Sequence, residues 1–240
     1  QFALMLAAPG QLVSVSYVSA DPVTSPMAEQ AASLTLNHGS AEQIYLMRPD
    51  LVLAHPWTDP TAIAMLRRLG IEVVQVPGVE RLADIPDRLA QVGTLLGRRD
   101  AATSLISQFE TDLAALSATD PGPRAAFYGP NGYTVGEGGL SHEILTHAGF
   151  RNIAAEVART DTGQIALELL VMAAPDLILR SMPYPGASQA EAILRHPALE
   201  ALIAAGAGHV TGPDWACGTP HVVAALRDLV ETRQAMEGAP

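Results

Sequence analysis

Short apolar runs alternate along the chain with longer stretches in which apolar residues recur every three or four positions. The short runs are rich in Val, Ile and Leu and are bounded by Pro, Gly or Asp, which is typical of buried strands. The longer stretches have the spacing of amphipathic helices. Strands are expected at residues 12–17, 51–54, 73–76, 124–128, 177–179 and 209–210. Helices are expected at residues 41–47, 60–69, 82–96, 141–148 and 166–173.

This alternation predicts an α/β fold with mainly parallel sheets flanked by helices. Residues 98–119 break the rhythm and are expected to form a single long helix. Leu105, Phe109, Leu113 and Leu116 would fall close to one face of it. The Asp-Pro-Gly-Pro run at 120–123 would stop that helix. The expected organisation is an N-terminal lobe at 1–97, a linking helix at 98–119 and a C-terminal lobe at 120–240.

One pattern occurs twice, at residues 42–54 and again from residue 168. Each copy opens with a glutamate, Glu42 or Glu168, continues through a short helical stretch to Pro-Asp, and enters an apolar strand. Two copies at the same internal spacing indicate two structurally related lobes. The alternative is a generic helix-to-strand turn, in which Pro-Asp is common.

Composition narrows the classes of protein. Hydrophobic residues make up 48% of the chain and charged residues 16%, which favours a packed globular protein. The net charge of −11 argues against binding nucleic acid through a basic surface. The only cysteine, Cys217, allows neither an internal disulfide nor a multi-cysteine metal site. No apolar run approaches the roughly 20 residues of a membrane span.

Several phrases occur in an order that resembles the periplasmic binding proteins of ABC importers for cobalamin and ferric siderophores. They are the Glu-led helix and strand at 42–54, the phrase at 69–76, the long helix that begins near Gly97, and two C-lobe phrases at 133–136 and 140–153. Together they cover nearly the whole chain. The family's opening strand would precede Gln1, so the first lobe is expected to lack its first strand.

The resemblance implies two lobes, each with a central sheet, joined by one long helix. The ligand would lie in the cleft between the lobes and would be an iron–siderophore, a cobalamin or a related metal chelate. The partners would be an ABC permease and its ATPase, with no nucleic acid. The expected protein is a periplasmic monomer that is not an enzyme and carries no cofactor.

The ligand site is expected on loops at the carboxyl ends of the strands, where open α/β sheets bind their ligands. Flat aromatic rings there would suit a corrin, a haem or a siderophore, although ordinary packing is the alternative role for aromatic residues. A single arginine could pair with a ligand carboxylate or phosphate, which favours cobalamin or a hydroxamate over a highly anionic catecholate. The expected ligand-binding residues are Trp57, His55, Tyr133, Arg180, Tyr184 and Trp215.

The resemblance also implies a docking pair. In the family, one glutamate on each lobe pairs with arginines of the permease, and here the pair would be Glu42 and Glu168. The alternative is that these carboxylates only complement the helix dipole. A rival assignment places docking on the next helix of each lobe, at Asp59 and Glu191.

Two other functions remain open. A bare metal-ion binder would need about three or four converging ligands, and His38 and His55 lie on the expected ligand loops. A chelatase-like or glycosyltransferase-like enzyme could use a related two-lobed fold. The chain has no Gly-x-Ser-x-Gly, no phosphate loop and no His-Glu-x-x-His, and Cys217 has no assigned base to make it a nucleophile.

Overall fold

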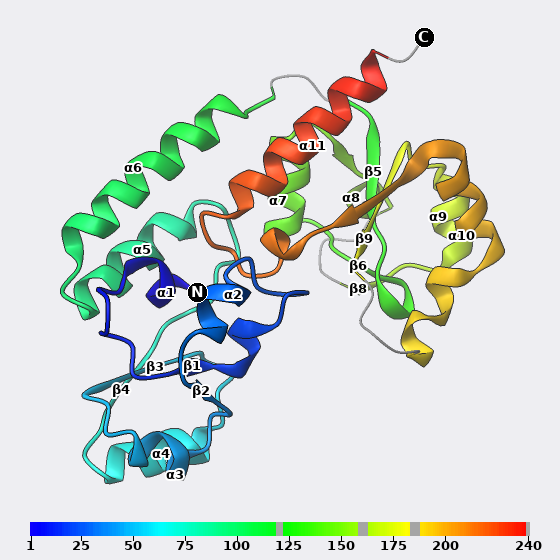
Figure 1. Cartoon of the computed structure of the whole chain (residues 1–240). Helices are drawn as coiled ribbons and strands as arrows, with labels where there is room; N and C mark the ends of the chain where they lie inside the picture. The colour runs from blue at the N-terminus through cyan, green and yellow to red at the C-terminus, as the bar shows by residue number, and fades with distance from the viewer. Residues whose placement is uncertain (119–121, 158–162, 183–187, 239–240) are drawn as a thin grey trace. The chain divides into compact units, whose positions relative to one another are not determined.

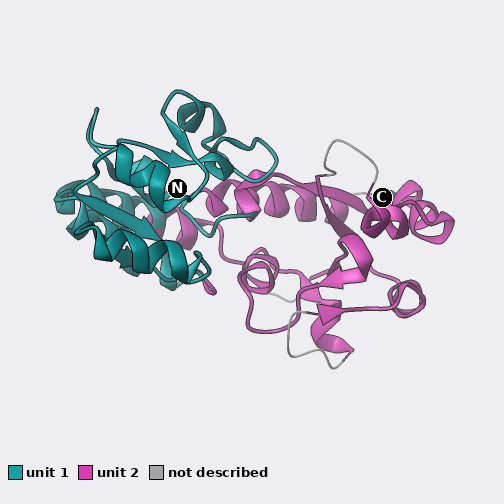
Figure 2. Cartoon of the chain, turned by 90° about the horizontal axis from the view of Figure 1, so that it is seen from below, with its two compact units in different colours: residues 1–79, 83–109, 216–220 teal, residues 80–82, 110–215, 221–240 magenta. Residues whose placement is uncertain are grey.

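A computed structural model of the chain describes residues 1–118, 122–157, 163–182 and 188–238. The chain forms two compact units (Figure 2). The lobe boundaries expected from the sequence stay a prediction. Unit 1 comprises residues 1–79, 83–109 and 216–220, and unit 2 comprises residues 80–82, 110–215 and 221–240.

Unit 1 combines short helices with two parallel strand pairs, β1 with β2 and β3 with β4. A small core lies where β3 and β4 meet α4, with Ile44 of α3 packed against it. The core residues are Ala54, Ile63, Leu66 and Val73. The elements are α1 (Phe2–Leu6), β1 (Val15–Ser16), a 3₁₀ turn η1 (Tyr17–Ala20), α2 (Ala28–Ala32), β2 (Leu36–Asn37), α3 (Ala41–Leu46), β3 (Leu51–Ala54), α4 (Pro60–Arg68), β4 (Glu72–Gln75), α5 (Asp84–Leu95) and the first part of α6 (Arg99–Ala115).

Unit 2 is larger and contains a four-stranded sheet. Its elements begin with the last part of α6. They continue with β5 (Arg124–Phe127), η2 (Pro130–Gly132), β6 (Tyr133–Thr134), α7 (Leu140–His147), β7 (Arg151–Asn152), α8 (Ile153–Glu156), β8 (Gly163–Gln164), α9 (Leu167–Ala173), β9 (Leu177–Ser181), η3 (Gln189–Arg195), α10 (Pro197–Leu202), η4 (Ile203–Ala207), β10 (Gly208–Thr211), η5 (Pro213–Trp215) and α11 (Val222–Glu237).

The four-stranded sheet of unit 2 has the order β10-β9-β5-β7, and all its strands are parallel. Figure 1 shows α7 and α11 on one side of this sheet and α9 and α10 on the other. The residues Leu177, Ile178 and Leu179 of the inner strand β9 are all buried, as expected for a strand covered on both faces. The predicted α/β class with parallel sheets is confirmed.

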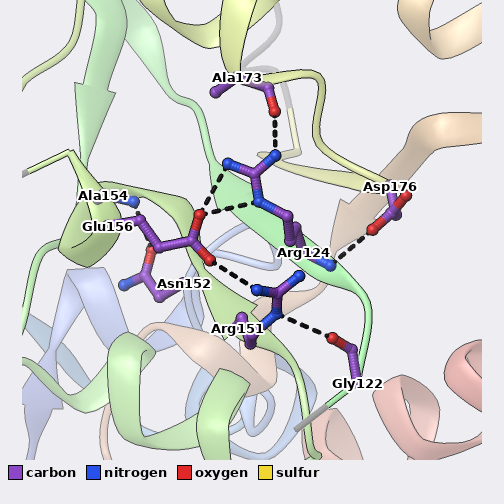
Figure 3. A network of polar contacts seen from close by, with 8 residues as sticks. All are labelled: Gly122, Arg124, Arg151, Asn152, Ala154, Glu156, Ala173 and Asp176. Atoms are coloured by element: carbon purple, nitrogen blue, oxygen red, sulfur yellow. Dashed lines mark hydrogen bonds and ion pairs between the residues drawn. The ribbon is translucent and has the colours of Figure 1, made fainter.

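Arg124, the first residue of β5, ties together several chain segments at one end of this sheet (Figure 3). Its backbone N–H donates to the Asp176 carboxylate at 2.7 Å, and its carbonyl accepts from the Asp176 N–H at 2.8 Å. Its guanidinium pairs with Glu156 at 2.7 Å and donates to the carbonyl of Ala173. Glu156 also contacts Arg151 at 3.5 Å. The end of α9 and the starts of β5 and β9 are therefore held at one point.

The sequence repeat is also a structural repeat. Glu42 and Glu168 lie in the first turns of α3 and α9. Just after each helix, a residue other than glycine takes a left-handed backbone, Arg48 with φ 51° and Ala174 with φ 45°. Pro-Asp and a parallel strand follow in both copies. A left-handed backbone costs an L-residue about 1–2 kcal/mol, so its recurrence shows that this route from helix to strand requires it.

Two helices differ from the expectation. The long helix was expected to reach residue 119, but α6 ends at Ala115. The chain leaves the helix because it pairs with the end of α7: the Ala118 N–H donates to the His147 carbonyl at 3.1 Å, and Nε2 of His147 lies 2.9 Å from the Leu113 carbonyl oxygen. The helix α11 was not expected, although its Leu226 and Leu229 are fully buried.

None of the helices in the described part of the chain has both the length and the apolar character needed to cross a membrane.

The left-handed turn gives a stability prediction. Ala174→Gly should raise the free energy of unfolding by about 0.5–1 kcal/mol, because glycine adopts positive φ without the Cβ clash that costs about 1–2 kcal/mol. The gain is partly offset, by about 0.4–1 kcal/mol, because glycine also has more freedom in the unfolded chain. Urea unfolding followed by circular dichroism measures the difference.

Ala173→Gly is the matched control. Ala173 is the last helical residue of α9, so glycine there should lower the free energy of unfolding by about 0.5–1 kcal/mol. A loss of stability at both positions would contradict the assignment of strain to residue 174.

Candidate functional site

Trp57 projects from a loop that follows β3 and is held by its own hydrogen bonds. The His55 N–H donates to Oγ1 of Thr58 at 3.0 Å, and the Trp57 N–H donates to Nδ1 of His55 at 3.2 Å. Gly78 leaves room for the imidazole, since a Cβ atom there would lie 3.2 Å from Nε2 of His55. The loop thereby presents the Trp57 side chain with 90% of its surface exposed.

Unit 1 carries a second ring pair that the sequence analysis did not select. Tyr17 follows β1 and His38 follows β2, and their ring centroids lie 4.5 Å apart. Both residues are exposed. They meet because β1 and β2 run parallel with Ser16 opposite Asn37. Position at the carboxyl end of a strand was the signal that could have selected Tyr17, which the sequence analysis placed inside a longer strand.

In unit 2, Tyr133 lies near the carboxyl end of β5. Its carbonyl accepts from the Gly129 N–H at 2.8 Å, and its ring meets Phe127 edge to face at 6.1 Å. The turn before it needs Gly132, whose φ is +73° and whose Cβ would lie 2.7 Å from the Ile165 carbonyl oxygen. The aromatic ring of Tyr133 is thereby fixed while it stays exposed.

Arg180 lies near the end of β9, opposite Val210 of β10. Its backbone carbonyl accepts from Oγ1 of Thr211 at 3.1 Å. The side chain is half-buried, and its Nε has no hydrogen-bond partner among the described residues. Near the carboxyl edge of the sheet, this Nε is a buried donor that none of the described residues satisfies. Tyr184, also expected here, lies outside the described residues.

Trp215 does not present an open aromatic surface as the sequence analysis expected. It is only 8% exposed, because the η5 turn that carries it packs against α11. Burial also raises the pKa of the neighbouring Asp214 carboxyl, an effect that the nearby His221 partly opposes. In this structure Trp215 belongs to the packing around α11.

Most histidines of unit 2 have structural partners. Nδ1 of His142 lies 3.1 Å from Nδ2 of Asn152, and Nδ1 of His196 accepts from the Ala198 N–H at 3.2 Å. His209 lies 3.0 Å from the Asp228 carboxylate. Within the described ranges, no group of three or more His, Cys, Asp or Glu side chains could hold a metal ion.

Cys217 is a poor nucleophile in this setting. Its thiol donates to the Thr24 carbonyl at 3.3 Å. Burial raises its pKa, although the positive N-terminus and Gln1 lower it in part. The thiol rather than the reactive thiolate is therefore the form present at neutral pH.

The acidic residues proposed for docking differ in environment. Glu42 and Glu168 are both exposed, and neither has an ion pair with another described residue in this structure. Asp59 is exposed but caps α4, its Oδ1 accepting from the Thr61 N–H at 2.9 Å. Glu191, its counterpart in the rival pair, is only 8% exposed.

Comparison with known proteins identifies a matching family and several related proteins. Residues 1–214 match the family described as periplasmic binding protein. The chain is 26% identical to the cobalamin-binding protein of Halobacterium salinarum over 206 residues, which cover 83% of this chain and 55% of that protein. It is 29% identical to the vitamin B12-binding protein of Salmonella choleraesuis over 200 residues, which cover 81% of this chain and 65% of that protein.

The chain thus spans between 55% and 65% of the length of these curated relatives. Among solved structures, the periplasmic haem-binding protein of Roseiflexus sp. RS-1 in its apo form superposes with a TM-score of 0.76 at 21% identity, covering 93% of this chain and 89% of that one. At that identity the likeness shows the fold, a two-lobed α/β architecture. Since the family match spans most of its length, the chain belongs to the periplasmic binding protein family.

Proposed function

We propose that the chain is the solute-binding component of an ABC importer. It captures an iron–siderophore, a cobalamin or a related metal chelate in the periplasm and delivers it to a permease and its ATPase. Members of its family are binding proteins. Relatives named for cobalamin and haem both bind a metal held in a large, nearly planar ring. The expected iron–siderophore ligand belongs to the same broad class of metal chelates.

The observation that carries this proposal is the exposed Trp57 ring on its hydrogen-bonded loop. A ring that is 90% exposed offers a large aromatic face, and a ligand that covers this face removes its apolar area from water. Because the loop is already ordered, little conformational entropy is lost when a flat ligand stacks on the ring. Tyr17 and His38 in the same unit, and Tyr133 in the other, offer further rings at strand ends.

The same arrangement supports a chelate rather than a bare ion. A bare divalent ion needs several converging charged or imidazole ligands. A different ligand suits aromatic faces and an arginine whose Nε has no partner among the described residues. Such a ligand brings its own metal ligands and carries peripheral carboxylate, amide or phosphate groups.

Docking is proposed through Glu42 and Glu168. They occupy equivalent first turns in the two units and are both exposed. The rival pair is less suitable, because Glu191 is buried and Asp59 already caps its helix. Arginine side chains on a permease would complement the carboxylates and steer the encounter.

The proposal is tested by titrating the purified protein with cyanocobalamin, haemin and a ferric hydroxamate. The chain has two tryptophans, so Trp215→Phe leaves Trp57 as the single reporter. Saturable quenching of Trp57 emission at one equivalent is expected for the true ligand. If none of the three chelates binds saturably, the proposed ligand class is wrong.

Trp57→Ala should weaken binding of that ligand about tenfold or more, because a stacked and desolvated ring of this size often contributes that much. The fold should be unaffected, because the side chain is almost fully exposed. Isothermal titration calorimetry measures the affinity, and thermal unfolding measures the stability.

Met65→Ala is the control for Trp57→Ala. Met65 is an exposed apolar residue in the middle of α4, away from the strand ends, and its removal should leave affinity unchanged. If the wild type and Trp57→Ala bind the ligand with equal affinity, the Trp57 ring is not part of the ligand site.

Tyr17→Phe distinguishes haem from corrinoid as the ligand. A phenol and an imidazole are both ligands of haem iron, so loss of the Tyr17 hydroxyl should change the visible spectrum of bound ferric haem and weaken its binding severalfold. Cyanocobalamin carries its own axial ligands, so its affinity should change by less than about twofold if Tyr17 gives only packing. Absorbance titrations measure both. An unchanged haem spectrum and affinity would exclude Tyr17 as an iron ligand.

A further inference from the structure

Two large apolar side chains are exposed at the same place in the two copies of the repeat. Leu46 of α3 is 71% exposed, and Met172 of α9 is 80% exposed. Each follows the first-turn glutamate, Glu42 or Glu168, by one helical turn. On a helix, residues one turn apart are neighbours on the same face. Each unit therefore presents a carboxylate beside an apolar side chain.

The cores of the two units explain why these side chains face outward. Ile44 packs against the core of unit 1, and Leu170 is fully buried in the core of unit 2. Leu46 and Met172 come two positions later, which is about 200° around an α-helix of 3.6 residues per turn. When the repeat buries Ile44 or Leu170, it must turn Leu46 or Met172 away from the core.

A single exposed leucine or methionine is ordinary and needs no explanation. The repetition does need one, because nothing in the turn or in the core requires an apolar residue at this outward position. Because most of each side chain is in water, a polar residue there would cost the fold little. Both units carry a glutamate next to an exposed apolar side chain. This repetition fits a partner that has two equivalent binding sites.

The surroundings of Leu46 show what such a binding site would meet. A shallow hollow of about 470 Å³ lies beside the end of α3 and is lined by Tyr45, Leu46, Arg48, Pro49 and Ile71. An apolar side chain of the partner could fit into this hollow, and Leu46 would then insert into an apolar pocket of the partner. The glutamate one turn away, on a chain of net charge −11, calls for a cationic group next to that surface.

We propose that Leu46 and Met172 are apolar anchors for docking onto the permease, each entering an apolar socket flanked by a cation that pairs with Glu42 or Glu168. This inference rests on the proposed transport function. Exposed ion pairs are weak and screened by salt, so on their own they steer more than they hold. Burial of an apolar side chain persists at high salt, and it would hold the docked complex.

The test measures docking of Leu46→Ser, Met172→Ser and the double variant to the permease–ATPase complex of the same importer, reconstituted in lipid nanodiscs. The double variant should dock at least tenfold more weakly at both low and high salt. Glu42→Gln combined with Glu168→Gln should dock more weakly at low salt and approach the wild type at high salt. Unfolding temperatures and affinities for cyanocobalamin or haemin should stay at wild-type values in every variant.

Met65→Ser is the matched control, because it removes an exposed apolar side chain from α4 of unit 1 and should not change docking. Wild-type docking by the double variant would overturn the anchors and leave the transport function standing. Failure of the wild type itself to dock would overturn both. Loss of self-association in the double variant, seen by sedimentation, with unchanged docking would assign the anchors to a second copy of the chain instead.

Discussion

The architecture of unit 2 depends on how the chain passes from α9 into β9. The backbone of Asp176 bonds the Arg124 carbonyl while its carboxylate bonds the Arg124 N–H, so one residue fixes β9 against β5. The Arg124 guanidinium closes the same corner through Glu156 and the Ala173 carbonyl. A slip of one position would turn each side chain of β9 to the opposite face of the sheet, where it would meet different neighbours, and would break these bonds.

That corner determines two surfaces at once. Because the strands of the sheet are parallel, their carboxyl ends lie at the same edge. Tyr133 and Arg180 lie near that edge. On the outside of α9, the same turn fixes which residues are buried and which face solvent. The left-handed residue Ala174 makes this possible at a cost in backbone energy. Arg48 has the same left-handed backbone in unit 1, so both copies of the repeat use this turn.

In each unit, the candidate ligand rings are held in place by backbone contacts rather than by a packed core. His55 accepts the Trp57 N–H, and Gly132 and Gly129 hold Tyr133 in place. Such contacts can keep large rings exposed without letting them collapse onto the protein. The lack of apolar burial at Trp57 is therefore offset by hydrogen bonds within its loop, and the ring stays available to a flat partner.

The sequence by itself determined the α/β class, a strand at 51–54, a strand at 124–128 that ends one residue earlier in the structure, and the repeat with its paired glutamates. These features follow from local periodicity and turn chemistry. Only the tertiary structure decided that Trp215 is buried while Trp57 is exposed, since both follow strands and differ in what packs over them. It also brought Tyr17 beside His38, through a pairing between strands that are distant along the chain. It ended α6 at Ala115, where pairing with α7 outweighs helix propensity. Burial and contact between distant segments depend on the whole fold, and local pattern does not contain them.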